Sequence, residues 1–147
     1  MAEPASGKLR IRLVTPERTL FESSATAVEL PSKSGDMEVL YGHAPLLAEL
    51  GAGDVRIHKG AGLEQHSPET TRYNVSWGFV EVLPDRVTIL ASDALKPDEI
   101  DVPRAEEQRA RGEKLWNEAG ESAEAYTEAL RVISEAEAKI ASAGEKA

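Results

Sequence analysis

The sequence predicts an α+β fold that is mainly β: an N-terminal antiparallel β-sandwich of about ten short strands, followed by a C-terminal antiparallel helical hairpin. Before about residue 97, short runs alternate between apolar and polar residues, which is typical of half-buried strands. Gly, Pro, Ser and Asp interrupt these runs at short intervals, as in a sandwich or barrel. After Asp98 the composition changes to Ala, Glu and Arg. We therefore predict a sandwich domain at residues 1–96 and a helical hairpin at residues 97–147.

The alternation of apolar and polar residues assigns side chains to the two faces of each predicted strand. In the run LRIRL (residues 9–13), the apolar side chains share one face and the arginines share the other. In the run VRIH (residues 55–58), Arg56 and His58 alternate with apolar residues, so we expect both to point outward. The glycines of GAG at residues 51–53 predict a turn, and the polar residues 61–70 predict an exposed hairpin loop.

Two helices are predicted in the second part of the chain. Asp101 is a suitable N-cap with Pro103 in the first turn, and the first helix is expected to run to about Glu118. A turn containing Gly120 follows, and a second helix is expected over residues 122–143. A short turn makes the helices antiparallel neighbours. A hairpin of this size cannot hold a deep core alone, so it should rest on the sandwich or on another protein.

Composition and motifs exclude several classes of function. The chain has 147 residues and a formal net charge of -9, which argues against binding a nucleic-acid backbone. It has no cysteine, so disulfides, thiolate nucleophiles and Cys-based zinc sites are excluded. We see no signal peptide and no run of about 20 apolar residues, so we expect any membrane association to come through another protein.

No catalytic or metal-binding constellation is recognisable. Phosphate-binding and nucleophile-elbow motifs are absent, and His43, His58 and His66 lack the spacing of metal ligands. We therefore predict a protein that is not an enzyme. Two tryptophans, Trp77 and Trp116, are open to two interpretations, as interface anchors or as core residues.

Several stretches in the same order resemble one known family. GDMEVLYGHAPLLAEL, which starts at residue 35, resembles the signature loop of the epsilon subunit of F-type ATP synthases. LRIRLVTPERTLFE is similar to the first two strands of that family, and GFVEVLPDRVTILASDA is similar to the last hairpin of its sandwich. IDVPRA at residues 100–105 matches an Ile-Asp-x-x-Arg-Ala pattern of some bacterial members. The similarity covers roughly residues 8–118.

The resemblance implies a structural role in a rotary machine. Such a subunit belongs to the central stalk, couples rotation of the membrane ring and gamma to ATP synthesis in the catalytic alpha/beta head, and has no catalytic residues. It would lie at the cytoplasmic face of the bacterial inner membrane as a peripheral protein held only by the complex. The expected partners are the gamma subunit, the rotor ring of c subunits and the head, and no nucleic acid. The expected contact residues are Gly35, Asp36, Tyr41, Gly42, His43 and Pro45.

The resemblance also implies regulation by the hairpin. In many bacterial members the hairpin inhibits ATP hydrolysis, and in some a regulatory ATP binds at positions that correspond to Asp101, Arg104 and Ala105. No cofactor is required for the coupling role. The chain departs from the ATP-binding pattern at Leu95, where those members carry an acidic residue, and in the many glutamates of the second helix, which repel phosphate. The alternatives are an N-cap with a surface ion pair at Asp101 and Arg104 and, for the whole chain, a free-standing adaptor or nucleotide-sensing module.

Overall fold

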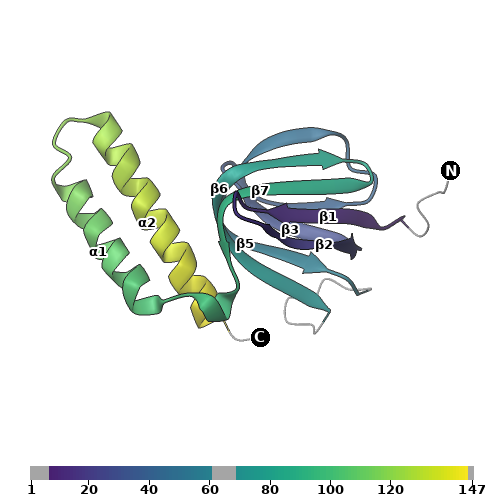
Figure 1. The fold of residues 1–147 in the computed structure, drawn as a ribbon. Helices are drawn as coiled ribbons and strands as arrows, with labels where there is room; N and C mark the ends of the chain where they lie inside the picture. The colour runs from purple at the N-terminus through teal and green to yellow at the C-terminus, as the bar shows by residue number, and fades with distance from the viewer. Residues whose placement is uncertain (1–6, 61–68, 146–147) are drawn as a thin grey trace.

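The computed structural model describes residues 7–60 and 69–145. In this part of the chain, seven strands are followed by a short 3-10 turn and two helices (Figure 1). The elements are β1 (Leu9–Val14), β2 (Thr19–Ala25), β3 (Ala27–Ser32), β4 (Gly35–Leu40), β5 (Leu46–His58), β6 (Thr70–Leu83), β7 (Arg86–Leu95), η2 (Pro97–Glu99), α1 (Val102–Asn117) and α2 (Ala123–Gly144). Most of the loop predicted at residues 61–70 lies outside the described residues.

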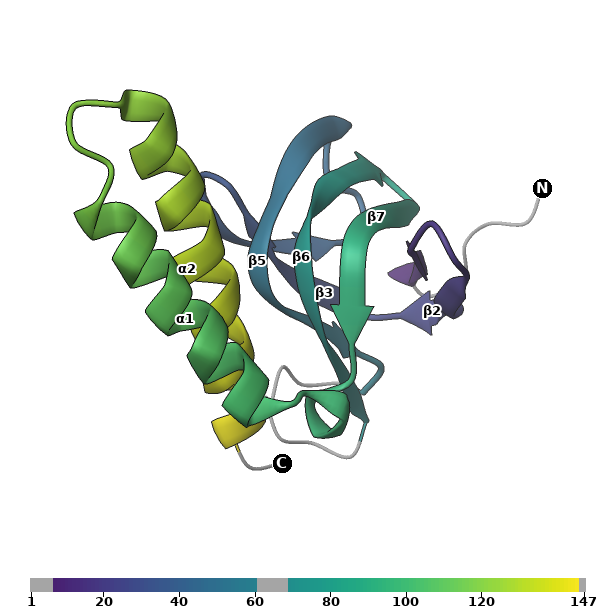
Figure 2. The same ribbon diagram turned by 60° about the vertical axis from the view of Figure 1, so that its left-hand side comes forward.

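The strands form a sheet in the order β2-β1-β7-β6-β5-β3-β4, with β1 and β7 parallel and the other neighbours antiparallel. The sheet curls around its own apolar face to make a sandwich (Figure 2). The predicted fold class is confirmed. The number of strands differs, since the described residues hold seven rather than about ten. Two of them, β5 with 13 residues and β6 with 14, are long and strongly bent.

The bend follows one row of residues across three neighbouring strands: Gly51, Trp77 and Ser92. We call this row the fold line. The ladder between β5 and β6 passes from Leu50–Gly78 to Ala52–Ser76, and the ladder between β6 and β7 passes from Gly78–Ala91 to Ser76–Asp93. The glycines at 51 and 53 therefore lie inside β5, and the turn predicted at residues 51–53 is wrong. Pairing with distant strands holds the backbone extended where local composition favours a turn.

Side chains change faces at the fold line. In β6, Val75 faces the core before the line and Val80 faces it after the line, although the two are five positions apart. Trp77 and Gly78 have positive φ values of 60° and 127°. A β-carbon on Gly78 would overlap the carbonyl oxygen of Leu90, so only glycine fits there.

The core is built from the alternating positions of the strands. Its fully buried larger members are Leu9, Ile11, Leu13, Val28, Leu30, Val39, Leu50, Val55, Ile57, Val75, Val80, Val82, Val87 and Ile89. The apolar faces predicted for residues 9–13 and 55–58 are therefore confirmed.

The prediction that His58 and Arg56 point out into solvent is wrong. His58 is fully buried, with Nε2 2.7 Å from a carboxylate oxygen of Glu29 and Nδ1 3.0 Å from the hydroxyl of Thr70. The Arg56 side chain is only 14% exposed and contacts Glu145 at the end of α2. The alternation of apolar and polar residues predicts which face of the sheet a side chain lies on. It cannot predict that other parts of the chain cover that face and bury the side chain.

The two helices form the predicted antiparallel hairpin. The predicted N-cap of the first helix is confirmed, since the carboxylate of Asp101 accepts from Arg104 N at 3.2 Å. The second helix is capped in the same way by Ser122, whose hydroxyl accepts from Ala125 N at 3.1 Å. The helices approach closely at Gly112, where a β-carbon would lie 2.7 Å from Ile133 Cγ1.

The hairpin lies beside the sandwich, with α2 between α1 and the sheet (Figure 1). Of the two supports predicted for the hairpin, the sandwich or another protein, the structure shows the sandwich, because α2 packs against β5, β6 and η2. The last strand ends at Leu95 and α1 begins at Val102, while the division into domains at residue 96 stays a prediction. Neither helix among the described residues is long and apolar enough to span a membrane.

Candidate functional site

The residues predicted for partner contact lie in two places. Gly35 and Asp36 begin strand β4, and the predicted residues from Tyr41 to Pro45 lie in the loop that follows it. Because a strand rises by about 3.3 Å per residue, the two ends of β4 are separated by about 17 Å. The structure therefore does not bring the six residues into one site, and we treat the two ends of β4 as two surfaces.

The loop between β4 and β5 is fixed by hydrogen bonds. Gly42 has a φ of 91°, and its N–H donates to the carbonyl oxygen of Pro84 at 2.7 Å. His43 N–H donates to the carbonyl oxygen of Leu40 at 3.2 Å, and its Nδ1 lies 2.7 Å from the carbonyl oxygen of Ala44. A carbonyl oxygen can only accept, so Nδ1 carries a proton here. His43 is thus held as part of a shaped loop, and Tyr41 and Pro45 beside it are exposed.

An exposed apolar patch continues from this loop across the outer surface of the sheet. We call Leu47, Phe79 and Leu90 the docking face; their exposed fractions are 70%, 51% and 48%. Phe79 is paired with Leu90 in the sheet, and Leu47 lies opposite Glu81, two residues further along β6. Exposed apolar side chains that neighbour one another across strands, as Phe79 and Leu90 do, favour an interaction site. The docking face was not predicted, although apolar residues at outward positions of β6 and β7 were its signal in the sequence.

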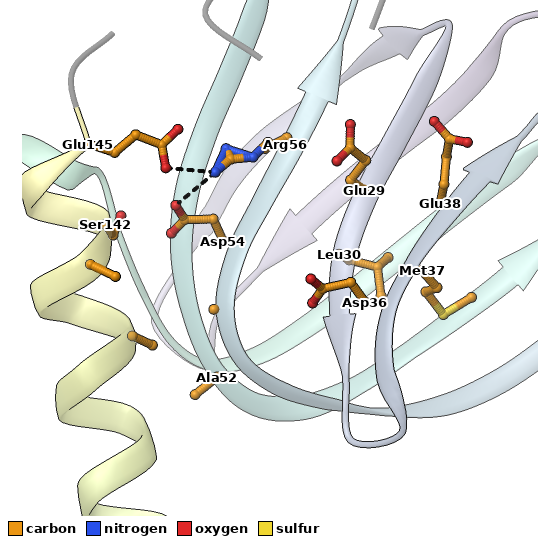
Figure 3. Close-up of a pocket in the computed structure, with 13 residues that line it drawn as sticks. Glu29, Leu30, Asp36, Met37, Glu38, Ala52, Asp54, Arg56, Ser142 and Glu145 are labelled. Atoms are coloured by element: carbon orange, nitrogen blue, oxygen red, sulfur yellow. Dashed lines mark hydrogen bonds and ion pairs between the residues drawn. The ribbon is translucent and has the colours of Figure 1, made fainter. Parts of the chain in front are cut away.

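The other end of β4 borders an acidic groove of about 660 Å³ between the β3–β4 hairpin and the end of α2 (Figure 3). The carboxylates on its lining are Glu29, Asp36, Glu38, Asp54 and Glu145. Arg56 is the basic residue among the described lining residues, and it is paired with Asp54 and Glu145. Exposed Asp36 and Glu38 give the rim of the groove a negative potential, which attracts cationic groups.

The three residues proposed for regulatory ATP lie together. Asp101, Arg104 and Ala105 line a cavity of about 370 Å³ where α1 begins, and Leu95 lines it too. The charged side chains of the lining are the carboxylates of Asp93, Glu99, Asp101 and Glu135 and the cations Arg104 and Lys139.

Four carboxylates against two cations disfavour a polyphosphate in this cavity. Lys139 is moreover engaged, with Nζ 3.5 Å from Asp93 and 3.2 Å from Glu135. The charges of the lining therefore do not fit ATP well, and ATP binding stays a prediction.

The two tryptophans have different surroundings. Trp77 is partly buried at the contact between sandwich and hairpin, where its Nε1 donates to Glu135 at 3.4 Å and the guanidinium of Arg131 lies 4.7 Å from the ring centre. Trp116 is 42% exposed and packs edge-to-face on Tyr126. Trp77 is thus an interface anchor within the chain.

The described residues contain no group of three or more His, Cys, Asp or Glu side chains placed to hold a metal ion. The prominent features are instead a sandwich with a buried apolar core, an exposed apolar face, a hydrogen-bonded loop and a helical hairpin at one side. These features define a class of protein, a β-sandwich subunit that assembles with other proteins.

Comparison with known proteins gives the particular family. The family model described as "ATP synthase, Delta/Epsilon chain, beta-sandwich domain" matches residues 8–97. The ATP synthase epsilon chain of Koribacter versatilis is 40% identical over 108 residues, which are 74% of this chain and 71% of that protein. The epsilon chain of Priestia megaterium is 41% identical over 105 residues, 71% and 73% of the two chains. The chain belongs to the ATP synthase epsilon-chain family.

Solved structures share the fold. A chain in the mitochondrial ATP synthase of Euglena gracilis (OSCP/F1/c-ring) superposes with a TM-score of 0.72 at 20% identity, over 94% of this chain and 84% of that one. A chain in the central stalk/c-ring structure of the mitochondrial ATP synthase of Tetrahymena thermophila superposes with a TM-score of 0.64 at 12% identity. The match covers 92% of this chain and 96% of that one. At these identities the likeness concerns the fold alone.

Proposed function

We propose that this chain is a non-catalytic subunit of the central stalk of a proton-translocating F-type ATP synthase. In this role it binds the gamma subunit and the membrane rotor ring and couples their rotation to ATP synthesis in the catalytic alpha/beta head. Membership of the epsilon-chain family is the observation that carries the proposal. The chain lies at the cytoplasmic face of the bacterial inner membrane, held there through the complex.

Two surfaces of the sandwich supply the contacts that this role needs. The docking face and the adjoining loop at His43 bind gamma, since an exposed apolar patch gains most from burial against another protein. The acidic end of β4 at Asp36 faces the polar loops of the ring, where a charged contact sets orientation and speeds association. Contacts at both ends of one strand hold the sandwich between two partners.

The hairpin is the regulatory part in this proposal. It restrains ATP hydrolysis by the head when it leaves the sandwich and extends along gamma. The docked arrangement in Figure 1 is then the form that does not restrain hydrolysis. A two-state element of this kind responds to a ligand only through the difference between its affinities for the two states.

The test measures ATP hydrolysis by the catalytic head with gamma, after addition of either the full chain or a chain that ends at Asp98. Faster hydrolysis with the shortened chain is expected if the hairpin inhibits. Equal rates with both chains bound would leave the coupling role and remove the inhibitory one. Failure of both chains to bind the head with gamma would overturn the assignment to the stalk.

A further inference from the structure

The end of helix α2 is held by an arginine of the sheet. Arg72 in β6 donates through Nη1 to the carbonyl oxygen of Ser142 at 3.0 Å and to its hydroxyl at 3.2 Å, and through Nη2 to the carbonyl oxygen of Glu145 at 3.1 Å. Carbonyl groups in the last turn of a helix have no partner within the helix and carry partial negative charge. A cation placed there satisfies both the hydrogen bonds and the helix dipole.

A second arginine completes this contact. Arg56 Nη2 lies 2.9 Å from the Glu145 carboxylate and 3.7 Å from the Asp54 carboxylate (Figure 3). The Asp54 carboxylate also lies 3.0 Å from Arg72. The side chains of Asp54, Arg56 and Arg72 are only 11%, 14% and 12% exposed. The sheet therefore presents two largely buried arginines with one aspartate between them, and the end of α2 supplies the balancing negative groups. We call Asp54, Arg56, Arg72, Ser142 and Glu145 the latch.

Other polar contacts extend along the same helix. Asn74 Nδ2 donates to the carbonyl oxygen of Ala138 at 3.3 Å. Lys139 bridges Asp93 of the sheet and Glu135 of its own helix, inside the cavity that Asp101 and Arg104 border. Lys139, one of the two cations on the lining of that cavity, is thus already engaged by carboxylates of the chain.

We propose that the docked hairpin is held by the latch and requires no nucleotide. The contacts of the latch are ion pairs and hydrogen bonds, so its polar groups regain water when the hairpin leaves the sheet. Removal of one latch arginine leaves the helix end without its counter-charge and favours the open form. The docking itself is a property of the isolated chain; its regulatory meaning rests on the proposed function.

The experiment uses the absence of cysteine, which allows two labels to be placed without altering native thiols. Ser34→Cys and Glu124→Cys put spin labels on two exposed positions. Their near neighbours Lys33 and Thr127 line one groove between the sandwich and α2. Pulsed electron paramagnetic resonance on the full-length chain then measures the distance between the labels, with and without Mg-ATP.

We expect a short-distance population without nucleotide and the same population after addition of Mg-ATP. Arg72→Gln should lose this population. Arg12→Gln is the matched control, because Arg12 is also a strand arginine with a carboxylate neighbour, Glu22 at 3.9 Å, but forms no part of the latch. It should keep the native distances.

Two outcomes would overturn the proposal. One is a chain that is open without nucleotide and closes on addition of Mg-ATP. The other is Arg72→Gln with native distances. If Arg72→Gln does not fold, Glu145→Gln serves instead, since Glu145 lies outside the sheet and its change should partly deplete the short-distance population; native distances in that variant count against the latch. None of these results depends on binding to gamma, so they can fail while the stalk assignment stands.

Discussion

Gly78 in β6 and the carbonyl oxygen of Leu90 in β7 lie so close together that a β-carbon on residue 78 would overlap that oxygen. The contact lies beside the fold line, where the three central strands bend and Gly78 takes a φ of 127°. The bend of the sandwich therefore depends on the absence of one side chain.

Gly78→Ala should lower the free energy of unfolding by about 3 kcal/mol or more, because backbone strain and steric overlap add. Urea unfolding followed by circular dichroism measures the loss. Gly35→Ala is the control, since Gly35 has nearly the same φ, 128°, with no neighbouring atom within 4 Å of the added carbon. Gly35→Ala should lose only the free energy that comes from backbone strain, about 1–3 kcal/mol. Equal losses in the two variants would contradict the overlap.

Stability at high pH should depend on Tyr73, whose hydroxyl donates to the carbonyl oxygen of Leu20 at 3.1 Å. Burial raises the pKa of Tyr73 above its ordinary value of 10.0, while Arg18 lowers it and Glu99 raises it to smaller extents. Above pH 10.0 the unfolded chain loses the proton while the folded chain keeps it, so stability falls as pH rises from there toward the folded pKa.

Tyr73→Phe should abolish this alkaline loss and cost about 1 kcal/mol near neutral pH through the lost hydrogen bond. Thermal unfolding on both sides of pH 10.0 compares the two proteins. The same alkaline decline in native protein and variant would show that another group causes it.

The close approach of the two helices at Gly112 predicts a local effect. Gly112→Val should destabilise the hairpin by about 1–3 kcal/mol, because the new side chain meets Ile133 and Val132. Amide hydrogen exchange should become faster in α1 and α2 and stay unchanged in the sandwich strands. Ala110→Val, on the exposed side of α1, is the control and should leave exchange nearly native. Faster exchange throughout the sandwich would mean that the two parts unfold together.

The docking face predicts a binding defect without a folding defect. Phe79→Ser should weaken binding to the gamma subunit by about tenfold or more, the loss expected when an apolar anchor is removed. Isothermal titration calorimetry measures the affinity, and unfolding curves check the stability. Lys59→Ser is the control, because Lys59 is an exposed residue just beyond the end of β5 opposite Leu47, outside the docking face and the hairpin, and this variant should bind normally. Native affinity of the Phe79 variant would place the gamma contact elsewhere.

Local signals in the sequence predicted the helices well. Asp101 and Ser122 cap their helices through hydrogen bonds to N–H groups three residues on, and such contacts need nothing from the rest of the fold. The apolar faces of residues 9–13 and 55–58 were predictable for the same reason, since alternation along an extended strand fixes which side chains share a face.

Features that depend on distant pairing were not predictable from short windows. The glycines at 51 and 53 favour a turn locally, yet pairing with β6 keeps them inside a strand of 13 residues. His58 was assigned to the outer face, but that assignment cannot show that Glu29 and Thr70 enclose it. Asp36 and His43 belong to one sequence motif and were predicted to form one contact site. They lie apart in space because the extended strand β4 runs between them.

The continuity of β5 and β6 around the fold line has a mechanical meaning. In a sandwich of two unconnected sheets, a twisting force on one sheet reaches the other through side-chain packing, and the sheets can slide. Here the same two backbones run through the bend, hydrogen-bonded to each other from Leu46–Val82 to His58–Thr70. A torque applied at one surface of this domain is carried to the opposite surface by covalent bonds, with little slack to absorb it.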